Sequence, residues 1–284
     1  MLNVFTDQIA ISQTLSNYKT KKETIGFVPT MGALHQGHLA LVKKALQDNA
    51  VVVVSVFVNP TQFDNAGDLE KYPRTLDKDV ELLHALSLDR ILIYAPSVFD
   101  IYQGKTQADH FDFDGLEFEM EGRFRAGHFN GVGTIVKRFF EILKPNTAYF
   151  GEKDFQQLAI IKKMVQKHAI PVQVIGCPIY RESSGLAMSS RNTRLSLKHK
   201  EAAPFIYETL NAAKSYFGIK SAKEIIDWVN AAFAKQNILE LEYFIIADVD
   251  TLKPVQQEIE TQKYRAFMAV YADDVRLIDN IALN

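Results

Sequence analysis

The sequence has little of several features that define whole classes of protein. Its 284 residues include a single cysteine, Cys177, which excludes an intrachain disulfide and is typical of a reducing compartment. The longest apolar run, residues 51–58, is interrupted by Ser55 and is far too short to cross a bilayer. The first residues lack the basic start and apolar stretch of a signal peptide. We therefore expect a soluble, cytoplasmic protein with no membrane partner.

The sequence also lacks a large excess of charge of either sign. Its formal net charge is -2, which argues against a dominant electrostatic footprint for nucleic acid, so no nucleic-acid partner is expected. With 47% hydrophobic and 23% charged residues, the composition is that of an ordinary globular protein. A chain of this length has room for one large domain or two smaller ones.

Strand and helix patterns alternate through the first half of the chain. Residues 25–29 and 51–58 are apolar runs typical of strands buried on both faces of a parallel sheet. A glycine-containing loop and a helical pattern that begins near His38 lie between them, which makes a right-handed βαβ unit. The alternation continues with a helix at 76–83, a strand at 90–95, a helix at 132–143, a strand at 147–150, a helix at 154–168 and a strand at 171–176. This α/β pattern predicts a doubly wound, Rossmann-like parallel sheet that binds its ligand at the carboxyl ends of the strands.

The pattern changes after about Cys177. Two amphipathic stretches precede three strand-like runs; the helices are expected at 198–217 and 221–235, and the strands at 241–247, 265–271 and 275–278. Helices followed by strands indicate a smaller α+β domain. We therefore predict two domains, residues 1–178 and residues 179–284.

The first candidate site is the loop of residues 29–38, Pro-Thr-Met-Gly-Ala-Leu-His-Gln-Gly-His, which follows the first buried strand. Backbone N–H groups and the positive end of the following helix favour phosphate there. Gly37 lets the backbone approach a ligand closely, and the spacing of His35 and His38 allows both to face it. Chance, helix capping and a zinc site are the alternatives, but no further His or Cys lies near enough in sequence to complete a zinc ligand set. We predict phosphate contact and no metal held by the protein itself.

The second candidate is residues 185–192, Gly-Leu-Ala-Met-Ser-Ser-Arg-Asn. Ser189, Ser190 and Arg191 offer hydroxyls and a guanidinium that can fold over phosphates from a flexible loop. Such a segment by itself is more often a solvated turn. The prediction of a phosphate-binding loop therefore depends on its occurrence together with the histidine motif.

The two motifs together resemble the paired HIGH and KMSKS signatures of the adenylate-forming nucleotidyltransferase superfamily. The residues between them are similar to the pantothenate synthetase (pantoate–β-alanine ligase) family, and the similarity covers essentially the whole chain. Its motifs are residues 29–38, 56–63 (Val-Phe-Val-Asn-Pro-Thr-Gln-Phe), 72–77 (Tyr-Pro-Arg-Thr-Leu-Asp), 121–132, 150–158 (Phe-Gly-Glu-Lys-Asp-Phe-Gln-Gln-Leu), 185–192 and 277–281. Several long motifs in one order are far more specific than either short motif.

The resemblance implies a reaction in two steps. Pantoate carboxylate attacks the α-phosphorus of ATP, which carries Mg²⁺ mainly through phosphate oxygens and water, and pyrophosphate leaves. The amine of β-alanine then attacks the acyl-adenylate and releases AMP. Because the carboxylate is already a nucleophile, the protein has only to align the reactants and stabilise charge on the phosphates. Cys177 is therefore expected to be structural, and the family suggests a homodimer.

The resemblance also implies roles for individual residues. The expected catalytic residues, which stabilise the departing pyrophosphate, are His35, His38, Lys153, Ser189, Ser190 and Arg191. The expected ATP contacts are Met31, Gly37, His38, Gly151, Lys153, Asp154, Met188, Ser189 and Arg191. The expected pantoate and β-alanine contacts are Met31, Asn59, Gln62, Phe63, Arg125, His128, Phe150 and Gln157. The first domain would thus bind nucleotide and pantoate, and the second would carry the loop that closes over the phosphates.

Many of these residues have a structural alternative. The histidines of residues 29–38 can cap a helix, Asn59 can form a turn or hold Gln62, and Arg125 and His128 can belong to a purely structural loop. Met31, Phe63 and Phe150 can equally be core residues. Asp77 and Asp79 are acidic candidates for supporting roles near the site, although a helical charge cluster is usually just solvated.

The chain departs from the family pattern at two places, and three rival functions stay open. Ala126 stands where the family has proline, and residues 271–274 lack the expected character before the last strand. The rivals are an adenylyltransferase that passes AMP to a phosphorylated acceptor, a nucleotide sensor without catalysis, and a nucleic-acid-binding relative of class I aminoacyl-tRNA synthetases. The intact set of phosphate-contacting residues argues against the sensor, and the charge balance and missing anticodon-binding extension argue against the synthetase relative.

Overall fold

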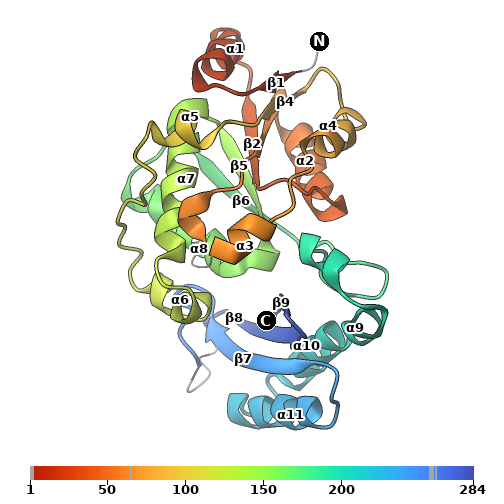
Figure 1. The fold of residues 1–284 in the computed structure, drawn as a ribbon. Helices are drawn as coiled ribbons and strands as arrows, with labels where there is room; N and C mark the ends of the chain where they lie inside the picture. Colours follow the sequence, from red (N-terminus) through yellow and green to blue (C-terminus); the bar gives the residue numbers. More distant parts are fainter. Residues whose placement is uncertain (1–2, 64–65, 256–258, 260) are drawn as a thin grey trace. The chain divides into compact units, whose positions relative to one another are not determined.

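A computed structural model describes residues 3–63, 66–255, 259 and 261–284 of the chain. The chain divides into two compact units (Figure 1). Unit 1 consists of Met1–Glu152 and Gln156–Pro178, and unit 2 of Lys153–Phe155 and Ile179–Asn284.

Unit 1 is built on a six-stranded sheet with the strand order β1-β4-β3-β2-β5-β6 (Figure 1). The strands are β1 (Val4–Phe5), β2 (Ile25–Thr30), β3 (Val51–Val56), β4 (Ile91–Tyr94), β5 (Thr147–Gly151) and β6 (Gln173–Cys177). Every pairing between neighbouring strands is parallel, and in the centre Val28 lies opposite Val54, which lies opposite Ile93. The predicted doubly wound α/β sheet is therefore confirmed.

Helices bury both faces of this sheet, which explains the continuous apolar runs of its strands. The helices and short 3₁₀ turns of the unit and its border are α1 (Gln8–Thr20), α2 (Gln36–Asp48), η1 (Pro60–Gln62), α3 (Ala66–Lys71), α4 (Leu76–His84), α5 (Val98–Tyr102), η2 (Leu116–Phe118), α6 (Glu121–Phe124), α7 (His128–Leu143), η3 (Glu152–Asp154) and α8 (Phe155–Lys167). Lys153 and Asp154 of η3 and Phe155 of α8 belong to unit 2. Val28 packs with Val42 of α2 and Leu83 of α4. Its neighbour Phe27 points to the opposite face, where its ring lies 5.5 Å from that of Phe139 in α7.

The carboxyl edge of the sheet has one place where the strand order reverses. The chain leaves β2 through α2 and continues into β3, whereas it leaves β5 on the other side of β2 and continues through α8 into β6. Doubly wound folds bind ligands beyond the strand ends at such a reversal. The histidine motif follows β2 directly, so the fold places it at this point.

In its described residues, unit 2 contains three α-helices and a three-stranded antiparallel sheet with the order β7-β8-β9. Its elements are the 3₁₀ turn η4 (Ser190–Arg194), α9 (Leu197–Ala202), α10 (Phe205–Tyr216), α11 (Ala222–Ala234), β7 (Glu240–Asp248), β8 (Tyr264–Ala272) and β9 (Val275–Ala282). One core joins Leu210 of α10 and Val229 of α11 with Ile246 and Met268 of the sheet. The smaller α+β arrangement predicted from the sequence is confirmed.

Several predicted elements differ from those in the structure. The single helix expected at 198–217 is two helices, α9 and α10, which meet at Pro204. Proline lacks an N–H, so the helical hydrogen bond that position 204 would donate is missing, although Ala203 and Pro204 both keep helical φ and ψ. Helix α7 begins four residues earlier than the predicted start at 132, and β9 extends to Ala282. Strand β1 and helix α1 were not predicted; β1 has two residues, and α1 buries only Ile11 and Leu15.

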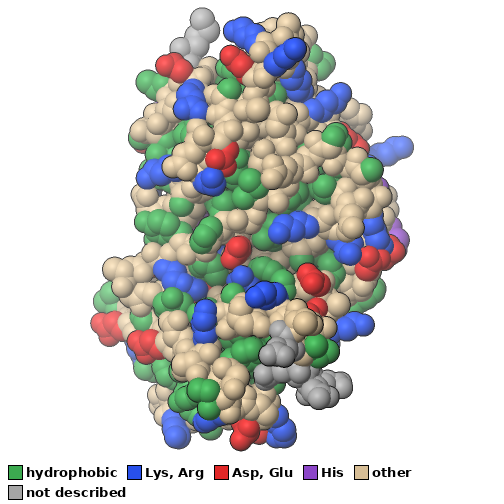
Figure 2. Space-filling model, turned by 180° about the vertical axis from the view of Figure 1, so that it is seen from behind, with side chains coloured by type: hydrophobic (Ala, Val, Ile, Leu, Met, Phe, Trp, Pro, Cys, Tyr) green, Lys and Arg blue, Asp and Glu red, His purple; other side chains and the backbone are tan. Residues whose placement is uncertain are grey.

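The surface carries charges of both signs. Figure 2 shows lysine and arginine side chains intermixed with aspartate and glutamate over the face that it draws, with apolar side chains between them. This mixture agrees with the formal net charge of -2. Within the described ranges, no helix combines the length and the apolar character needed to span a membrane.

Candidate active site

The segment that leaves β2, residues 30–38, is named the histidine loop here. Gly32 and Ala33 have φ values of +81° and +50°, in the left-handed region that favours glycine. A Cβ atom on Gly32 would lie 3.0 Å from Val56 Cγ1 and 3.1 Å from Asp79 Oδ2, so a side chain at position 32 would require these neighbours to shift. This compact turn leads the chain from the sheet edge into α2.

The two histidines of the loop are oriented by the start of α2. His35 is the N-cap residue, and its Nδ1 accepts a hydrogen bond from Gly37 N at 3.2 Å. His38 Nδ1 accepts from His35 N at 3.4 Å, and the two rings stack with centroids 4.0 Å apart. Because Nδ1 is an acceptor in both rings, the proton of each neutral imidazole is on Nε2. Helix capping and hydrogen-bond donation to a ligand thus use different nitrogens, so the two roles expected for these histidines are compatible.

Asp79 of α4 holds the backbone of the histidine loop. Its side chain is buried at 1% exposure. Oδ2 accepts from Ala33 N at 3.0 Å, and Oδ1 accepts from Leu34 N at 2.7 Å. Thr75 Oγ1 also donates to Oδ2, at 3.2 Å. The carboxylate therefore occupies the concave turn that the two successive N–H groups form.

The sequence pattern alone does not separate Asp79 from Asp77, which is exposed in the structure. The available signal was helical spacing, because Asp79 lies four residues before Leu83, a buried residue of the same helix. An acidic residue on an apolar helix face requires a polar partner inside the protein. Across the described ranges, no three His, Cys, Asp or Glu side chains come together in a way that could hold a metal ion.

A buried network in unit 1 orients Gln62. Asn59, exposed at only 1%, donates from Nδ2 to Gln62 Oε1 at 3.1 Å and to Gly131 O at 3.2 Å. Its Oδ1 accepts from the Tyr102 hydroxyl at 2.5 Å. Gln62 Nε2 in turn donates to Met31 Sδ at 3.0 Å. Of the roles considered for Asn59, the structure shows the contact with Gln62.

Arg125 and His128 meet the backbone of the same residue. His128 is buried, and its Nδ1 lies 2.8 Å from Gln62 O, which can only accept, so Nδ1 carries the proton. Its Nε2 then accepts from Arg125 Nη1 at 3.2 Å. This tautomer is opposite to that of His35 and His38. The contacts of His128 are those of the structural alternative. Arg125, which is half-buried, also donates from Nη2 to Gln62 O at 3.4 Å.

The remaining predicted substrate contacts of unit 1 differ in accessibility. Phe150 in β5 is buried, and Phe63 is half-buried with its ring 5.8 Å from that of Tyr72. On α8, Gln156 is buried and bonds to backbone groups of residues 116, 119 and 121. The next residue, Gln157, is half-buried, and its amide makes no hydrogen bond within the described part of the chain. Gly37 lies in the first turn of α2 and Gly151 at the end of β5, and both are half-buried.

In unit 2, residues 181–192 form a tethered hairpin and turn, named the serine–arginine loop here. Arg181 and Ala187 are bridged as in an antiparallel pair. Ser189 caps η4 by accepting from Arg191 N at 3.3 Å. Asn192 Nδ2 donates to Glu182 Oε1 at 2.7 Å and to Ala187 O at 3.1 Å. The backbone of this segment is thus ordered, as a bridged hairpin that leads into the 3₁₀ turn η4.

The hairpin is also tied to the sheet of unit 2. The Arg181 guanidinium binds both carboxylate oxygens of the buried Asp279 in β9, at 2.6 and 3.0 Å. It also lies 3.7 Å over the centre of the Tyr207 ring. Such a bidentate pair fixes orientation as well as distance. Met188 N donates to Tyr180 O at 3.0 Å and so aligns the other side of the hairpin.

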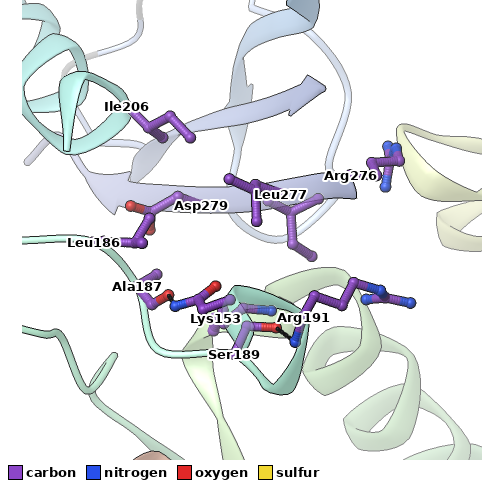
Figure 3. A pocket seen from close by; sticks show the side chains of 11 residues that line it. Lys153, Leu186, Ala187, Ser189, Arg191, Ile206, Arg276, Leu277 and Asp279 are labelled. Atoms are coloured by element: carbon purple, nitrogen blue, oxygen red, sulfur yellow. Dashed lines mark hydrogen bonds between the residues drawn. The ribbon is translucent and has the colours of Figure 1, made fainter. Parts of the chain in front are cut away.

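A small pocket in unit 2 is lined by this loop and by β9. Figure 3 shows Lys153, Ser189 and Arg191 on one side and Leu277 and Arg276 on the other. Lys153 Nζ lies 3.5 Å from Asp154 Oδ1, a long ion pair with a half-exposed partner. Within the described ranges, the Arg191 side chain makes no hydrogen bond or ion pair. The pocket therefore presents cationic groups, the kind of lining that suits phosphate.

Arg276 is a charged residue of the pocket that was not among the residues predicted from the sequence. Its guanidinium binds Glu242 Oε2 of β7, with distances of 2.7 Å from Nε and 2.6 Å from Nη2. The available signal was its position immediately before the terminal motif of residues 277–281.

The fold and the histidine loop define the class of protein. A doubly wound parallel sheet with a helix N-terminus and two imidazole donors at its switch point is the arrangement of an α/β nucleotide-binding protein. The family model described as pantoate-beta-alanine ligase matches residues 3–282. Because the match covers nearly the whole length, the chain belongs to the pantoate–β-alanine ligase family.

Individual relatives agree with this assignment. The pantothenate synthetase of Flavobacterium psychrophilum is 55% identical, with 99% of each chain covered, and that of Christiangramia forsetii is 54% identical, with 100% of each covered. The crystal structure of pantothenate synthetase from Thermus thermophilus matches with a TM-score of 0.90 at 38% identity, with 99% of each chain covered. The pantoate–β-alanine ligase of Francisella tularensis, complexed with βγ-ATP and β-alanine, matches with a TM-score of 0.78 at 35% identity over 99% of this chain and 97% of that one.

Proposed function

We propose that this chain condenses pantoate with β-alanine to pantothenate, using ATP and passing through a pantoyl-adenylate, with release of pyrophosphate and AMP. The observation that carries the proposal is the pair of stacked imidazoles at the start of α2. Both rings are held as Nε2–H donors beyond the carboxyl end of β2. Donors fixed before the reaction stabilise charge that develops on phosphate oxygens without a cost of reorientation at that moment.

In the first step, a carboxylate oxygen of pantoate attacks the α-phosphorus, and the bond from that phosphorus to the pyrophosphate oxygen breaks. His35 and His38 donate to the phosphate oxygens as this charge develops. Lys153 and Arg191 neutralise charge on the triphosphate, and the hydroxyls of Ser189 and Ser190 donate hydrogen bonds to it. Further ATP contacts come from Met31, Gly37, Gly151, Asp154 and Met188. Magnesium enters as part of Mg·ATP and is held by phosphate oxygens and water. Asp79 does not fit as its ligand, because both of its oxygens already accept backbone hydrogen bonds.

The substrate side of the proposal rests on neutral amides and an apolar wall. Gln62 and Gln157 suit the hydroxyls and carboxylate of pantoate, because an amide both donates and accepts. Met31, Phe63 and Phe150 provide apolar surface for its dimethyl group. Arg125 is better suited than His128 to the carboxylate of β-alanine, because a guanidinium carries a permanent positive charge and five N–H donors, whereas a neutral imidazole has two nitrogens and both already have partners in His128.

The experiment that tests the function is pyrophosphate release by the purified protein with Mg·ATP, first with pantoate and then with pantoate and β-alanine. Sustained turnover that requires both, with AMP and pantothenate as products, is the expected result. ATP binding without pyrophosphate release would favour the sensor, and transfer of AMP to a phosphorylated acceptor would favour an adenylyltransferase. We further propose that the protein is a cytoplasmic homodimer. Light scattering on the purified protein measures its mass in solution and so tests the dimer.

A further inference from the structure

We propose that Asp79 is a positioning residue for the adenylation step. Its role is to fix the left-handed turn of the histidine loop so that Met31 on one side and the two imidazoles on the other keep their places. This inference rests on the proposed function, because it assigns Asp79 a part in the step that releases pyrophosphate. It does not make Asp79 a catalytic residue, since its carboxylate contacts the protein backbone and Thr75.

The buried carboxylate of Asp79 binds the stretch of backbone that separates Met31 from the two histidines, His35 and His38. Met31 immediately precedes the turn and accepts from Gln62, while Leu34, whose N–H binds Asp79 Oδ1 at 2.7 Å, immediately precedes the N-cap residue His35. Any shift of the peptides on either side of Ala33 therefore moves both groups. Misplacement of a reacting group by about 1 Å can cost about 100-fold in rate.

The turn requires an external anchor because its conformation is unfavourable on its own. Ala33 has a φ of +50°, and residues other than glycine rarely adopt such a value. The N–H groups of Ala33 and Leu34 form an anion-binding concavity that Asp79 already occupies. The concavity is therefore not where the nucleotide phosphates bind, and its function is to hold the loop.

The test compares Asp79→Asn with Asp77→Asn. Asparagine keeps the volume, but its NH₂ group faces a backbone N–H where a carboxylate oxygen stood. We expect the single-turnover rate of pyrophosphate release to fall about 10- to 100-fold, with the KM for ATP changed less than about threefold. Asp77→Asn, on the exposed face two residues away, should retain the rate of the original protein.

Two further readouts separate positioning from general destabilisation. Acyl transfer from supplied pantoyl-adenylate to β-alanine does not expel pyrophosphate, so Asp79→Asn should lower its rate by less than about threefold. Nitrogen NMR of the folded variant should show altered amide signals for Ala33 and Leu34. It should also show that His35 and His38 no longer carry their proton on Nε2 alone. Equal losses in both half-reactions, or unchanged histidine signals, would overturn the positioning role.

The outcomes distinguish this inference from the function on which it rests. Normal pyrophosphate release by Asp79→Asn would overturn the positioning role alone. No release by the original protein would overturn the proposed function and the positioning role together. If Asp79→Asn does not fold, Thr75→Val removes only the hydroxyl contact with Oδ2 and should lower release about 3- to 10-fold. An unchanged rate in that variant would overturn the positioning role as well.

Discussion

The histidine loop of unit 1 and the serine–arginine loop of unit 2 hold their functional groups in opposite ways. In the histidine loop the side chains themselves are fixed, since each imidazole accepts a backbone hydrogen bond and the rings stack. In the serine–arginine loop the backbone is fixed by Asn192, while the Arg191 guanidinium lies at the end of a long side chain without a hydrogen bond to the described residues.

The difference corresponds to two kinds of phosphate chemistry. A donor that must meet one oxygen as its charge develops gains from a fixed direction. A cation that attracts a triphosphate needs charge more than direction, and a flexible side chain can follow the ligand as it binds. The comparison therefore predicts that changes in the histidine loop affect turnover, whereas changes in the serine–arginine loop affect nucleotide affinity.

The largest effect is expected from His38→Ala. Loss of one fixed donor should lower kcat about 100- to 1000-fold, while the KM for ATP changes less than about threefold. Steady-state pyrophosphate release measures both constants. His110→Ala, at an exposed histidine outside the loop, is the control and should leave kcat unchanged. Loss of ATP affinity at unchanged kcat would contradict the assigned role and remove the contrast between the loops.

A smaller effect is expected when the tether of the serine–arginine loop is strained by Gly185→Ala. Gly185 has a φ of +89°, and a Cβ atom would lie 2.6 Å from Tyr207 Cδ1, in the ring over which Arg181 stacks. The free energy of unfolding should fall by about 2–3 kcal/mol, the sum of backbone strain and overpacking.

Urea denaturation of Gly218→Ala supplies the matched control for this strain. Gly218 has a φ of +80°, and a Cβ atom added there would meet nothing within 4 Å, so only about 1 kcal/mol should be lost. Equal losses in the two variants would show that the contact with Tyr207 does not tether the hairpin.

Arg191→Ala should weaken ATP binding without abolishing turnover. We expect the KM for ATP to rise about tenfold, and Arg191→Lys to recover it to within about threefold, because a mobile cation acts mainly through its charge. The effect should shrink at high salt. Arg194→Ala is the control, since Arg194 lies in the same turn but pairs with Asp274 at 2.5 Å on the surface. A lysine variant as poor as the alanine variant would indicate a fixed bidentate contact.

The sequence predicted the features that depend on residues close together along the chain. The apolar runs predicted β2 and β3, and the segment with two histidines three residues apart predicted a loop that leads into a helix. It did not predict contacts between segments distant along the chain. Asp79 binds a backbone N–H 45 residues away, and His128 contacts Gln62 O across 66 residues. Pro204 itself indicates a helix break, but the apolar periodicity continues on both sides of it, so a single helix was predicted.

The smallest effect is expected at Cys177, which ends β6 just before the serine–arginine loop. The residue is 6% exposed and packs in the core that Val28 and Val42 share. Cys177→Ala should leave kcat and both KM values within about twofold, because no step of the proposed reaction uses a thiol. The free energy of unfolding should fall by about 1 kcal/mol, since a buried atom is removed.

The chemistry of the thiol tests the same point without a substitution. Burial raises the pKa of the Cys177 thiol above its ordinary value, so the fold disfavours the thiolate. The stability that this contributes is present below the thiol pKa of the unfolded chain and is lost as the pH rises through the folded value. Iodoacetamide should therefore label the native protein slowly at neutral pH, and faster in urea or at higher pH. Rapid labelling that abolishes turnover would show that the Cys177 thiol takes part in the reaction. The histidine loop and the serine–arginine loop would then no longer explain the activity by themselves.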